Sequence, residues 1–305
     1  MIKTITYRNA AGDSIVFPAG FSAGSPFVLQ DASGVLEAKA DLFTTGGALS
    51  DGVTWQGSRL KERNIVLTVR DNPRSDHAWN RARLFTVFKF KEEGVVTVSN
   101  ENGVVRSIAA VVESVTPDLK SRSNSYQISL LCPNPYWTDA DTQETDVTSW
   151  EDGWEWPITA QDDSGLFEIV SDTPEEDVFE FGGRTESVIA DIVNTGDVTC
   201  GMVILFSALG IASNPGILNP DTGEFLRVNL TMAAGDTLEV DTRYGHRTAV
   251  LSSGGVKTNV FRLVDPDSVF LQLKPGDNHV KAQSGAGDTN DLDITIFWDN
   301  QYLSV

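Results

Sequence analysis

The sequence contains one pattern that is typical of a nucleophilic serine. Gly20, Ser22 and Gly24 form a G-x-S-x-G, which presents a reactive serine when it joins a buried strand to a helix in an α/β sheet. Here Ser25 and Pro26 follow at once, and the residue before a proline is disfavoured in a helix. No histidine stands in a pattern that marks it as the partner base. The sequence therefore predicts a glycine- and serine-rich loop and no catalytic residues.

Spacings that bind metals, phosphates or dinucleotides are also missing. Cys132 and Cys200 stand far apart and outside any cysteine and histidine cluster, so two reduced thiols are expected. Asp139 and Asp141 begin like a calcium-binding loop, but Glu144 occupies the position that needs glycine. A Gly-Lys pair, which every phosphate-binding P-loop contains, does not occur. We expect no metal and no cofactor.

Aromatic and acidic residues leave two other functions open. Trp150, Trp154 and Trp156 form a cluster that either contacts a glycan or protein partner or caps the core of a sandwich domain. The first alternative would make the protein a carbohydrate-binding module that recognises host cell-surface glycans. The 43 Asp and Glu residues also permit a glycosidase-type pair of carboxylates, but no two of them are singled out by their spacing.

Length and charge indicate two domains. A chain of 305 residues predicts two domains at about 150 residues each. Residues 1–137 hold 15 Lys and Arg against 13 Asp and Glu, whereas residues 138–305 hold 8 against 30. This break predicts domains at 1–137 and 138–305. The net charge of −20 argues against nucleic-acid binding, and no apolar run approaches the ~18 residues of a membrane-spanning helix. The first residues alternate like a strand and lack the continuous apolar region and small-residue cleavage site of a secretory signal peptide. Synthesis in a cytoplasm is therefore expected.

The hydrophobic pattern predicts a mainly β protein with one helix. In the first half, strands are expected at 14–17, 64–70, 94–99 and 104–112. Asn102 and Gly103 predict a hairpin between the last two. Residues 73–90 carry apolar residues at helical spacing, with Ser75 or Asp76 as the N-cap. The glycine-rich stretch 44–55 is either a hairpin arm that reaches a neighbouring molecule or a mobile surface loop.

The second half predicts a β-sandwich or jelly roll without a helix. Its expected strands are 187–193, 202–206, 216–219, 225–228, 237–241, 248–251, 269–273 and 293–298. Residues 138–152 are acidic with little apolar content, and an exposed linker or long loop is expected there.

Several motifs in order resemble a known family. The run 125–129 leads into Cys132-Pro-Asn-Pro-Tyr-Trp137, which resembles the close of the N-terminal domain in distal tail proteins of bacteriophages with long non-contractile tails. The other matching segments cover nearly the whole chain and are 57–67, 81–85, 192–197, 214–217, 222–224, 235–242 and 273–278.

The resemblance implies a structural protein of the virion, not an enzyme. It implies an N-terminal β domain decorated with one α-helix, which assembles into a homo-hexameric ring, and a C-terminal galectin-like β-sandwich. The implied partners are the major tail tube protein, the tail-associated tip or hub protein, and receptor-binding or accessory adsorption proteins, without nucleic-acid binding or membrane insertion. The implied location is the phage tail tip, after synthesis in the bacterial host cytoplasm.

Two expectations about surfaces follow. Large aromatic and arginine side chains are enriched at protein interfaces, and the candidates for the contact between subunits are Trp55, Arg59, Arg63 and Trp79. The sugar-binding strand of galectins has the pattern His-x-Asn-x-Arg, but His246 is followed directly by Arg247. Because a fold alone does not carry an activity, we expect the second domain to be a docking scaffold without the galectin sugar site.

Overall fold

The computed structural model describes residues 1–22, 24–47, 51–73, 75–118, 124–147, 150–151, 183–184, 189–284 and 291–305. The chain forms two compact units. The first unit consists of Met1–Thr142, Thr195–Thr199 and Asp299–Val305, and the second of Gln143–Asn194 and Cys200–Trp298. The predicted domain boundary after Trp137 stays a prediction. Within the described residues, no helix has both the length and the apolar character needed to span a bilayer.

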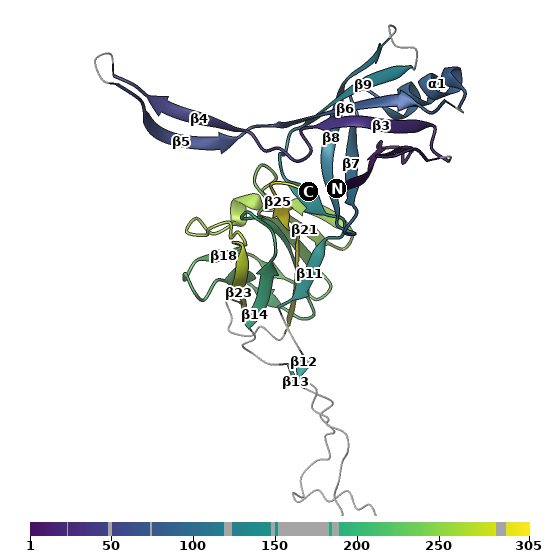
Figure 1. The fold of residues 1–305 in the computed structure, drawn as a ribbon. Helices are drawn as coiled ribbons and strands as arrows, with labels where there is room; N and C mark the ends of the chain where they lie inside the picture. Colours follow the sequence, from purple (N-terminus) through teal and green to yellow (C-terminus); the bar gives the residue numbers. More distant parts are fainter. Residues whose placement is uncertain are drawn as a thin grey trace, which may run out of the picture. The chain divides into compact units, whose positions relative to one another are not determined.

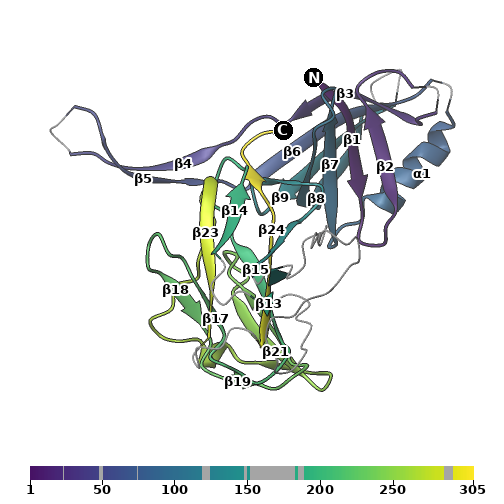
Figure 2. The ribbon, with the colours of Figure 1, turned by 90° about the horizontal axis from the view of Figure 1, so that it is seen from below.

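The first unit is built on a nine-stranded antiparallel sheet. Its main path runs β2-β1-β7-β8-β9-β6-β3, with β10 and β25 attached beside it (Figures 1 and 2). The strands are β1 (Ile2–Arg8), β2 (Ser14–Pro18), β3 (Phe27–Ser33), β6 (Arg63–Asp71), β7 (Glu93–Asn100), β8 (Val105–Asp118), β9 (Ser125–Cys132), β10 (Trp137–Asp139) and β25 (Gln301–Tyr302). The hairpin predicted around Gly103 is confirmed as the connection between β7 and β8, and Gly103 has a φ of 82° there.

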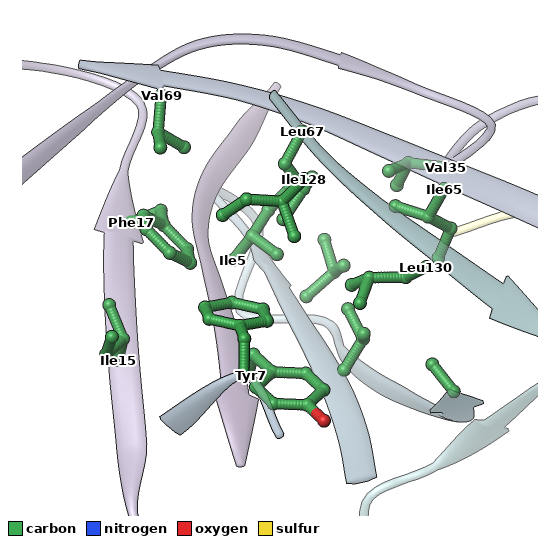
Figure 3. Packing of buried hydrophobic residues seen from close by; sticks show 14 of the residues in the cluster. Ile5, Tyr7, Ile15, Phe17, Val35, Ile65, Leu67, Val69, Ile128 and Leu130 are labelled. Atoms are coloured by element: carbon green, nitrogen blue, oxygen red, sulfur yellow. The ribbon is translucent and has the colours of Figure 1, made fainter. Parts of the chain in front are cut away.

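The core of this unit follows from strict alternation along the strands. In β6 every second residue points inward, so that Ile65, Leu67 and Val69 are fully buried between two charged residues, Arg63 and Asp71 (Figure 3). The apolar members pack in one cluster with the inward residues of β1, β2 and β9. The charged members lie at the two ends of the same face and need polar partners there.

One helix, α1 (His77–Val87), covers part of the sheet (Figure 1). Asp76 is its N-cap, because the carboxylate accepts hydrogen bonds from the backbone N–H of Ala78 at 2.9 Å and of Trp79 at 3.3 Å. Leu84 and Val87 are buried on the sheet side. The predicted helix is therefore confirmed, with ends inside the expected range of 73–90.

The predicted linker at 138–152 is wrong over much of its length. Thr138 and Asp139 belong to β10, which pairs with β25 and β8. Residues Gln143–Asp146 form β11, which pairs with β24 (Leu292–Trp298), and Val147 is buried. The acidic composition reflects strands with one face in solvent, whose backbone hydrogen bonds are satisfied by pairing and not by water.

The second unit is a two-sheet β-sandwich, as predicted. One sheet has the order β11-β24-β15-β20-β21-β22 and the other β14-β23-β17-β18 (Figures 1 and 2). Its remaining elements are β12 (Trp150–Glu151), β13 (Gly183–Arg184), β14 (Ile189–Asn194), β15 (Met202–Ala208), β16 (Ala212–Ser213), β17 (Gly216–Leu218), β18 (Phe225–Arg227), β19 (Thr231–Met232), β20 (Thr237–Asp241), β21 (Thr248–Ser253), β22 (Val256–Asn259), the 3-10 helix η1 (Phe261–Leu263) and β23 (Gly276–Gln283). A second apolar cluster fills the space between the two sheets.

One predicted strand of this unit is wrong, and one long observed strand was not predicted. The run 269–273 is not a strand, although Leu271 and Leu273 are buried. The Gln272 amide donates to the carbonyls of Thr242, Phe270 and Leu271, and Leu273 forms only an isolated bridge with Cys200. The long strand that was not predicted is β23. It begins at Gly276 within the turn-like sequence 273–278, which gives no sign of a strand.

Candidate assembly surfaces of the first unit

A long two-stranded hairpin projects from the first unit. Strands β4 (Ala40–Thr45) and β5 (Thr54–Leu60) pair antiparallel with each other and with no other described strand. Figures 1 and 2 show this arm extending away from the nine-stranded sheet, on the side opposite α1. Of the two alternatives for residues 44–55, the structure confirms a hairpin arm. Its contact with a neighbouring molecule stays a prediction.

The arm presents large apolar side chains that nothing in the unit covers. Trp55 is 65% exposed and Val53 is 68% exposed. Leu42 and Phe43 on β4 are also exposed. A two-stranded hairpin is marginally stable by itself, and exposed strand edges with apolar residues favour pairing with another chain. The arm therefore has the properties of an interaction element.

Charges on the arm hold its two strands together. Asp41 on β4 lies 3.4 Å from Arg59 Nη2 on β5 and 3.4 Å from Lys61 Nζ just beyond it. The Arg59 guanidinium also lies 5.9 Å from the ring centroid of Phe43. All of these groups are in contact with solvent, so each ion pair contributes no more than about 1 kcal/mol.

The base of the arm is fixed by Arg63, which is only 5% exposed. Its Nε donates to the Pro135 carbonyl at 2.9 Å, and its Nη2 donates to the Leu303 carbonyl at 2.8 Å. Nη1 donates to the carbonyls of the segment that leads into the arm, which are those of Gly34, Val35 and Glu37. The guanidinium thus ties the arm, the end of the first half and the 299–305 segment together.

Burial also decides the state of Cys132, opposite Arg63 in the strand register. Desolvation raises the pKa of the Cys132 thiol to about 12, against the smaller opposing effect of the Arg63 charge. The thiol is therefore protonated at neutral pH and behaves as a small apolar side chain.

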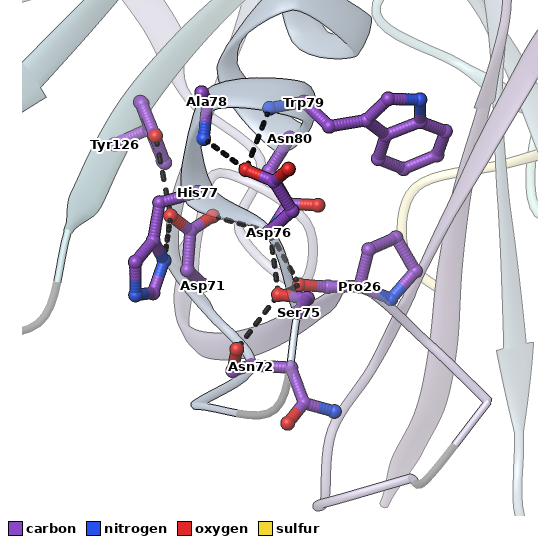
Figure 4. Close-up of polar contacts among 10 residues, drawn as sticks. All are labelled: Pro26, Asp71, Asn72, Ser75, Asp76, His77, Ala78, Trp79, Asn80 and Tyr126. Carbon is purple, nitrogen blue, oxygen red and sulfur yellow. Dashed lines mark hydrogen bonds and ion pairs between the residues drawn. The ribbon is translucent and has the colours of Figure 1, made fainter.

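At the other end of β6, the carboxylate of Asp71 is fully buried within a polar network at the start of α1 (Figure 4). It lies 2.8 Å from His77 Nδ1 and accepts a hydrogen bond from Asn80 Nδ2 at 3.0 Å. The Tyr126 hydroxyl donates to it at 3.4 Å. Burial, with a smaller contribution from Asp71, raises the pKa of Tyr126 to about 12, so the hydroxyl keeps its proton. The network fixes the helix against β6 and β9.

The network contains one serine, Ser75, whose hydroxyl accepts from Asn80 at 2.6 Å and contacts the carbonyls of Asn72 and Pro26 (Figure 4). In the described part of the chain, no serine, threonine or cysteine side chain hydrogen-bonds to His77, although the Asp71 contact orients its ring. Ser22 of the G-x-S-x-G lies in the loop between β2 and β3. Among the described residues, no three His, Cys, Asp or Glu side chains lie close enough together to hold a metal ion.

A groove of about 510 Å³ lies beside α1 and along β2, the strand at the end of the sheet path. Ile15, Val16 and Pro26 line it, together with Trp79, which is 54% exposed. The Arg83 guanidinium lies 5.7 Å from the Trp79 ring and donates to the Ser14 carbonyl of β2 at 3.4 Å. The groove is an apolar surface next to an open strand edge.

The structure places the predicted interface residues in three locations. Trp55 and Arg59 lie on the arm, Arg63 lies buried at its base, and Trp79 lies in the groove. Their role between subunits stays a prediction. The aromatic cluster falls on β12 at Trp150, of whose side chain nothing is described, and on two positions outside the described residues, Trp154 and Trp156.

Comparison with known proteins identifies the second half. Residues 195–302 match the family model for the siphovirus-type tail component, C-terminal domain. These residues are similar to the C-terminal domain of siphovirus-type tail components. A siphovirus tail is part of the virion, and the predicted resemblance to distal tail proteins is confirmed. No curated protein sequence matches the chain.

Solved tail structures share the fold. The crystal structure of SPP1 Dit, described as a paradigm of the hub adsorption apparatus in phages that infect Gram-positive bacteria, matches with a TM-score of 0.66 and 15% identity over 98% of this chain and 99% of that one. The baseplate of phage P2 in its activated conformation, solved with Ca and with Sr, matches with a TM-score of 0.50 and 11% identity over 100% of both chains. The chain thus has the fold of SPP1 Dit over nearly its whole length.

Proposed function

We propose that this tail component is the distal tail hub of its phage. In this role the first units of identical copies join into a hexameric ring that continues the tail tube. The second units form the platform on which the tail-tip protein and the receptor-binding or accessory adsorption proteins dock. The protein is made in the host cytoplasm, and its role is structural and not catalytic.

One observation carries this proposal. The arm and the groove are two uncovered apolar surfaces of the same unit. Helix α1, whose Trp79 and Arg83 line the groove, lies on the side of the unit opposite the arm (Figure 1). A contact between two different surfaces of identical copies is head-to-tail, and such contacts close into rings when the rotation between copies permits. The arm of one copy, with Trp55 at its centre, would enter the groove beside Trp79 of the next.

Charge supports the same pairing. Helix α1 carries Arg81 and Arg83 and no carboxylate. The arm carries Asp51 in the connection between its strands, in addition to Asp41, which is paired with Arg59 and Lys61. The first half as a whole is close to neutral, so copies packed in a ring do not repel one another strongly.

The test is the mass of the purified full chain by light scattering, followed by negative-stain electron microscopy. We expect closed rings of about six subunits. Trp55→Ser and Trp79→Ser should each convert rings to monomers. The matched control is Val104→Ser, which changes an exposed apolar residue of the β7–β8 turn. Rings that persist in both tryptophan variants, or a wild-type protein that stays monomeric, would contradict the proposal.

A further inference from the structure

The positive charges of the second half are concentrated in one stretch. Residues 138–305 hold 8 Lys and Arg against 30 Asp and Glu, yet residues 243–262 hold four of those cations and no carboxylate. This stretch covers the turn after β20, then β21, β22 and the start of η1. An acidic domain therefore carries one segment of the opposite charge.

Three of the four cations are unpaired in the described part of the chain. Arg243 is neutralised, because its guanidinium binds the Asp241 carboxylate with contacts of 3.1 and 2.7 Å. Arg247, Lys257 and Arg262 are exposed and form no ion pair with a described carboxylate. They remain available to an outside anion.

Arg247 lies within a series of aromatic rings. Its guanidinium carbon is 4.9 Å from the ring centroid of Phe270 and 5.9 Å from that of Tyr244. Phe270 in turn stacks on Phe261, with the centroids 5.8 Å apart and the planes 14° from parallel. We refer to Tyr244, Arg247, Phe261 and Phe270 as the Arg247 ladder. Cation–π contacts of this length orient a guanidinium without using its hydrogen-bond donors.

The ladder has a rigid foundation. Phe270 packs against the core of the second unit. The Gln272 amide donates to the carbonyl of Thr242 at 2.7 Å, and the buried Thr242 hydroxyl donates to the Met202 carbonyl. These bonds hold the start of the turn that carries Tyr244, whose side chain is 89% exposed. Phe270 and the backbone of the turn are thereby held in place, and a surface that is already ordered loses little conformational entropy when a partner binds.

We propose that the Arg247 ladder is the docking site for an acidic segment of another protein. A carboxylate of the partner binds the two outer nitrogens of the Arg247 guanidinium, and an apolar neighbour of that carboxylate packs on Tyr244 and Phe261. Arginine and tyrosine are the residue types that carry most of the energy at protein interfaces, and the planar guanidinium matches a carboxylate. The acidic surroundings repel the same partner elsewhere, which directs it to this site.

A carbohydrate fits the ladder less well. Sugar hydroxyls both donate and accept hydrogen bonds, whereas the ladder offers the donors of Arg247 and a single hydroxyl that can accept, on Tyr244. No carboxylate in the stretch 243–262 supplies further acceptors. The inference rests on the proposed function in one respect: that function makes the acidic partner an adsorption component of the tail.

The experiment measures fluorescence polarisation of a labelled peptide of alternating glutamate and leucine on the full chain. Two comparison ligands are the same peptide with glutamine in place of glutamate, and an oligomer of galacturonate, which carries carboxylates on sugar rings. The variants are Arg247→Gln and Tyr244→Ala, both at exposed positions that leave the fold intact. The matched control is Lys274→Gln, which removes one exposed positive charge of the same unit outside the ladder.

We expect the glutamate peptide to bind, and Arg247→Gln and Tyr244→Ala each to weaken it about tenfold, while Lys274→Gln leaves the affinity unchanged. No binding, an equal loss in Lys274→Gln, or tighter binding of the galacturonate oligomer would overturn the proposal. Light scattering on the same samples separates this result from the proposed function, because ring formation is expected to depend on the arm and the groove and to survive in the ladder variants.

Discussion

The Nη2 of Arg63 donates a hydrogen bond to the carbonyl oxygen of Leu303, which lies 240 residues further along the chain, at 2.8 Å. The same guanidinium holds the carbonyls of Gly34, Val35 and Glu37 at the base of the arm. One buried side chain therefore connects the arm of the first unit to the 299–305 segment.

Replacing Arg63 should destabilise the first unit strongly. Arg63→Met keeps much of the apolar stem but leaves several buried carbonyls without a donor, and we expect a loss of about 3 kcal/mol or more in the free energy of unfolding. Urea denaturation of the full chain measures this. The control, Arg59→Met on the exposed surface of the arm, should change stability by about 0.5 kcal/mol or less. Equal effects of the two changes would show that the Arg63 hydrogen bonds contribute nothing.

Removing residues 299–305 should open the sheet of the first unit. Tyr302 is buried in the first core, and its ring lies 3.3 Å from the guanidinium carbon of Arg106. Loss of this ring leaves a cavity that costs about 3–5 kcal/mol, and hydrogen exchange of the β8 and β10 amides should accelerate. Tyr302→Phe keeps the ring and loses only the hydrogen bonds of the hydroxyl with Asp139 and Thr195, so it should cost about 1–2 kcal/mol. Unchanged exchange in the truncated chain would contradict the prediction.

Gly34 should not tolerate a side chain. Its φ is +79°, and a Cβ atom there would lie 1.9 Å from the carbonyl oxygen of Asn64. Because the obstacle is backbone, we expect Gly34→Ala to destabilise the first unit by about 2–4 kcal/mol, measured as a shift of the unfolding midpoint. Gly20→Ala is the matched control, since nothing lies within 4 Å of its Cβ position. The idea fails if both alanine variants unfold at the wild-type midpoint.

The loop between β17 and β18 should respond to pH through His279. Asp221 hydrogen-bonds its Nδ1 at 2.7 Å and is the main reason that the pKa of His279 is raised above its ordinary value of 6.5, with a smaller contribution from Asp191. A raised folded-state pKa means that protonated His279 stabilises the fold below pH 6.5, and that this contribution is lost as the pH rises through the folded-state pKa. NMR titration of the imidazole should show the raised pKa, and Asp221→Asn should lower it more than Asp191→Asn. A larger effect of Asp191→Asn would contradict the assigned cause.

Sequence patterns found the elements whose hydrophobic alternation is regular. The β7–β8 hairpin, α1 and β15 are predicted nearly at their observed positions because apolar periodicity and turn residues agree there. Edge strands such as β11 lack this regular alternation, because their side chains are mostly polar, and their sequence therefore indicates a linker. The run 269–273 has the apolar alternation of a strand, but its backbone pairs only at single residues, Val269 with Phe225 and Leu273 with Cys200, and forms no ladder.

The candidate assembly surfaces could likewise be predicted only in part from the sequence. Trp55, Arg59 and Trp79 could be selected by residue type and do lie at the surface. Arg63 was selected by type as well, but the period of two along β6 places it on the inward face with Ile65, a signal that would have predicted its burial. The groove beside α1 could not be predicted, because its walls come from segments that are distant in the sequence.

The return of residues 195–199 and 299–305 to the first unit has a consequence for biosynthesis. A nascent chain that has reached residue 298 contains the arm, the helix and eight of the nine strands of the first sheet. It lacks β25 and the Leu303 carbonyl that Arg63 binds. Folding of the first unit is therefore completed only after the second unit has been translated. Chains interrupted by premature termination would carry an unfinished assembly unit, which favours their removal by proteases over their entry into a growing tail.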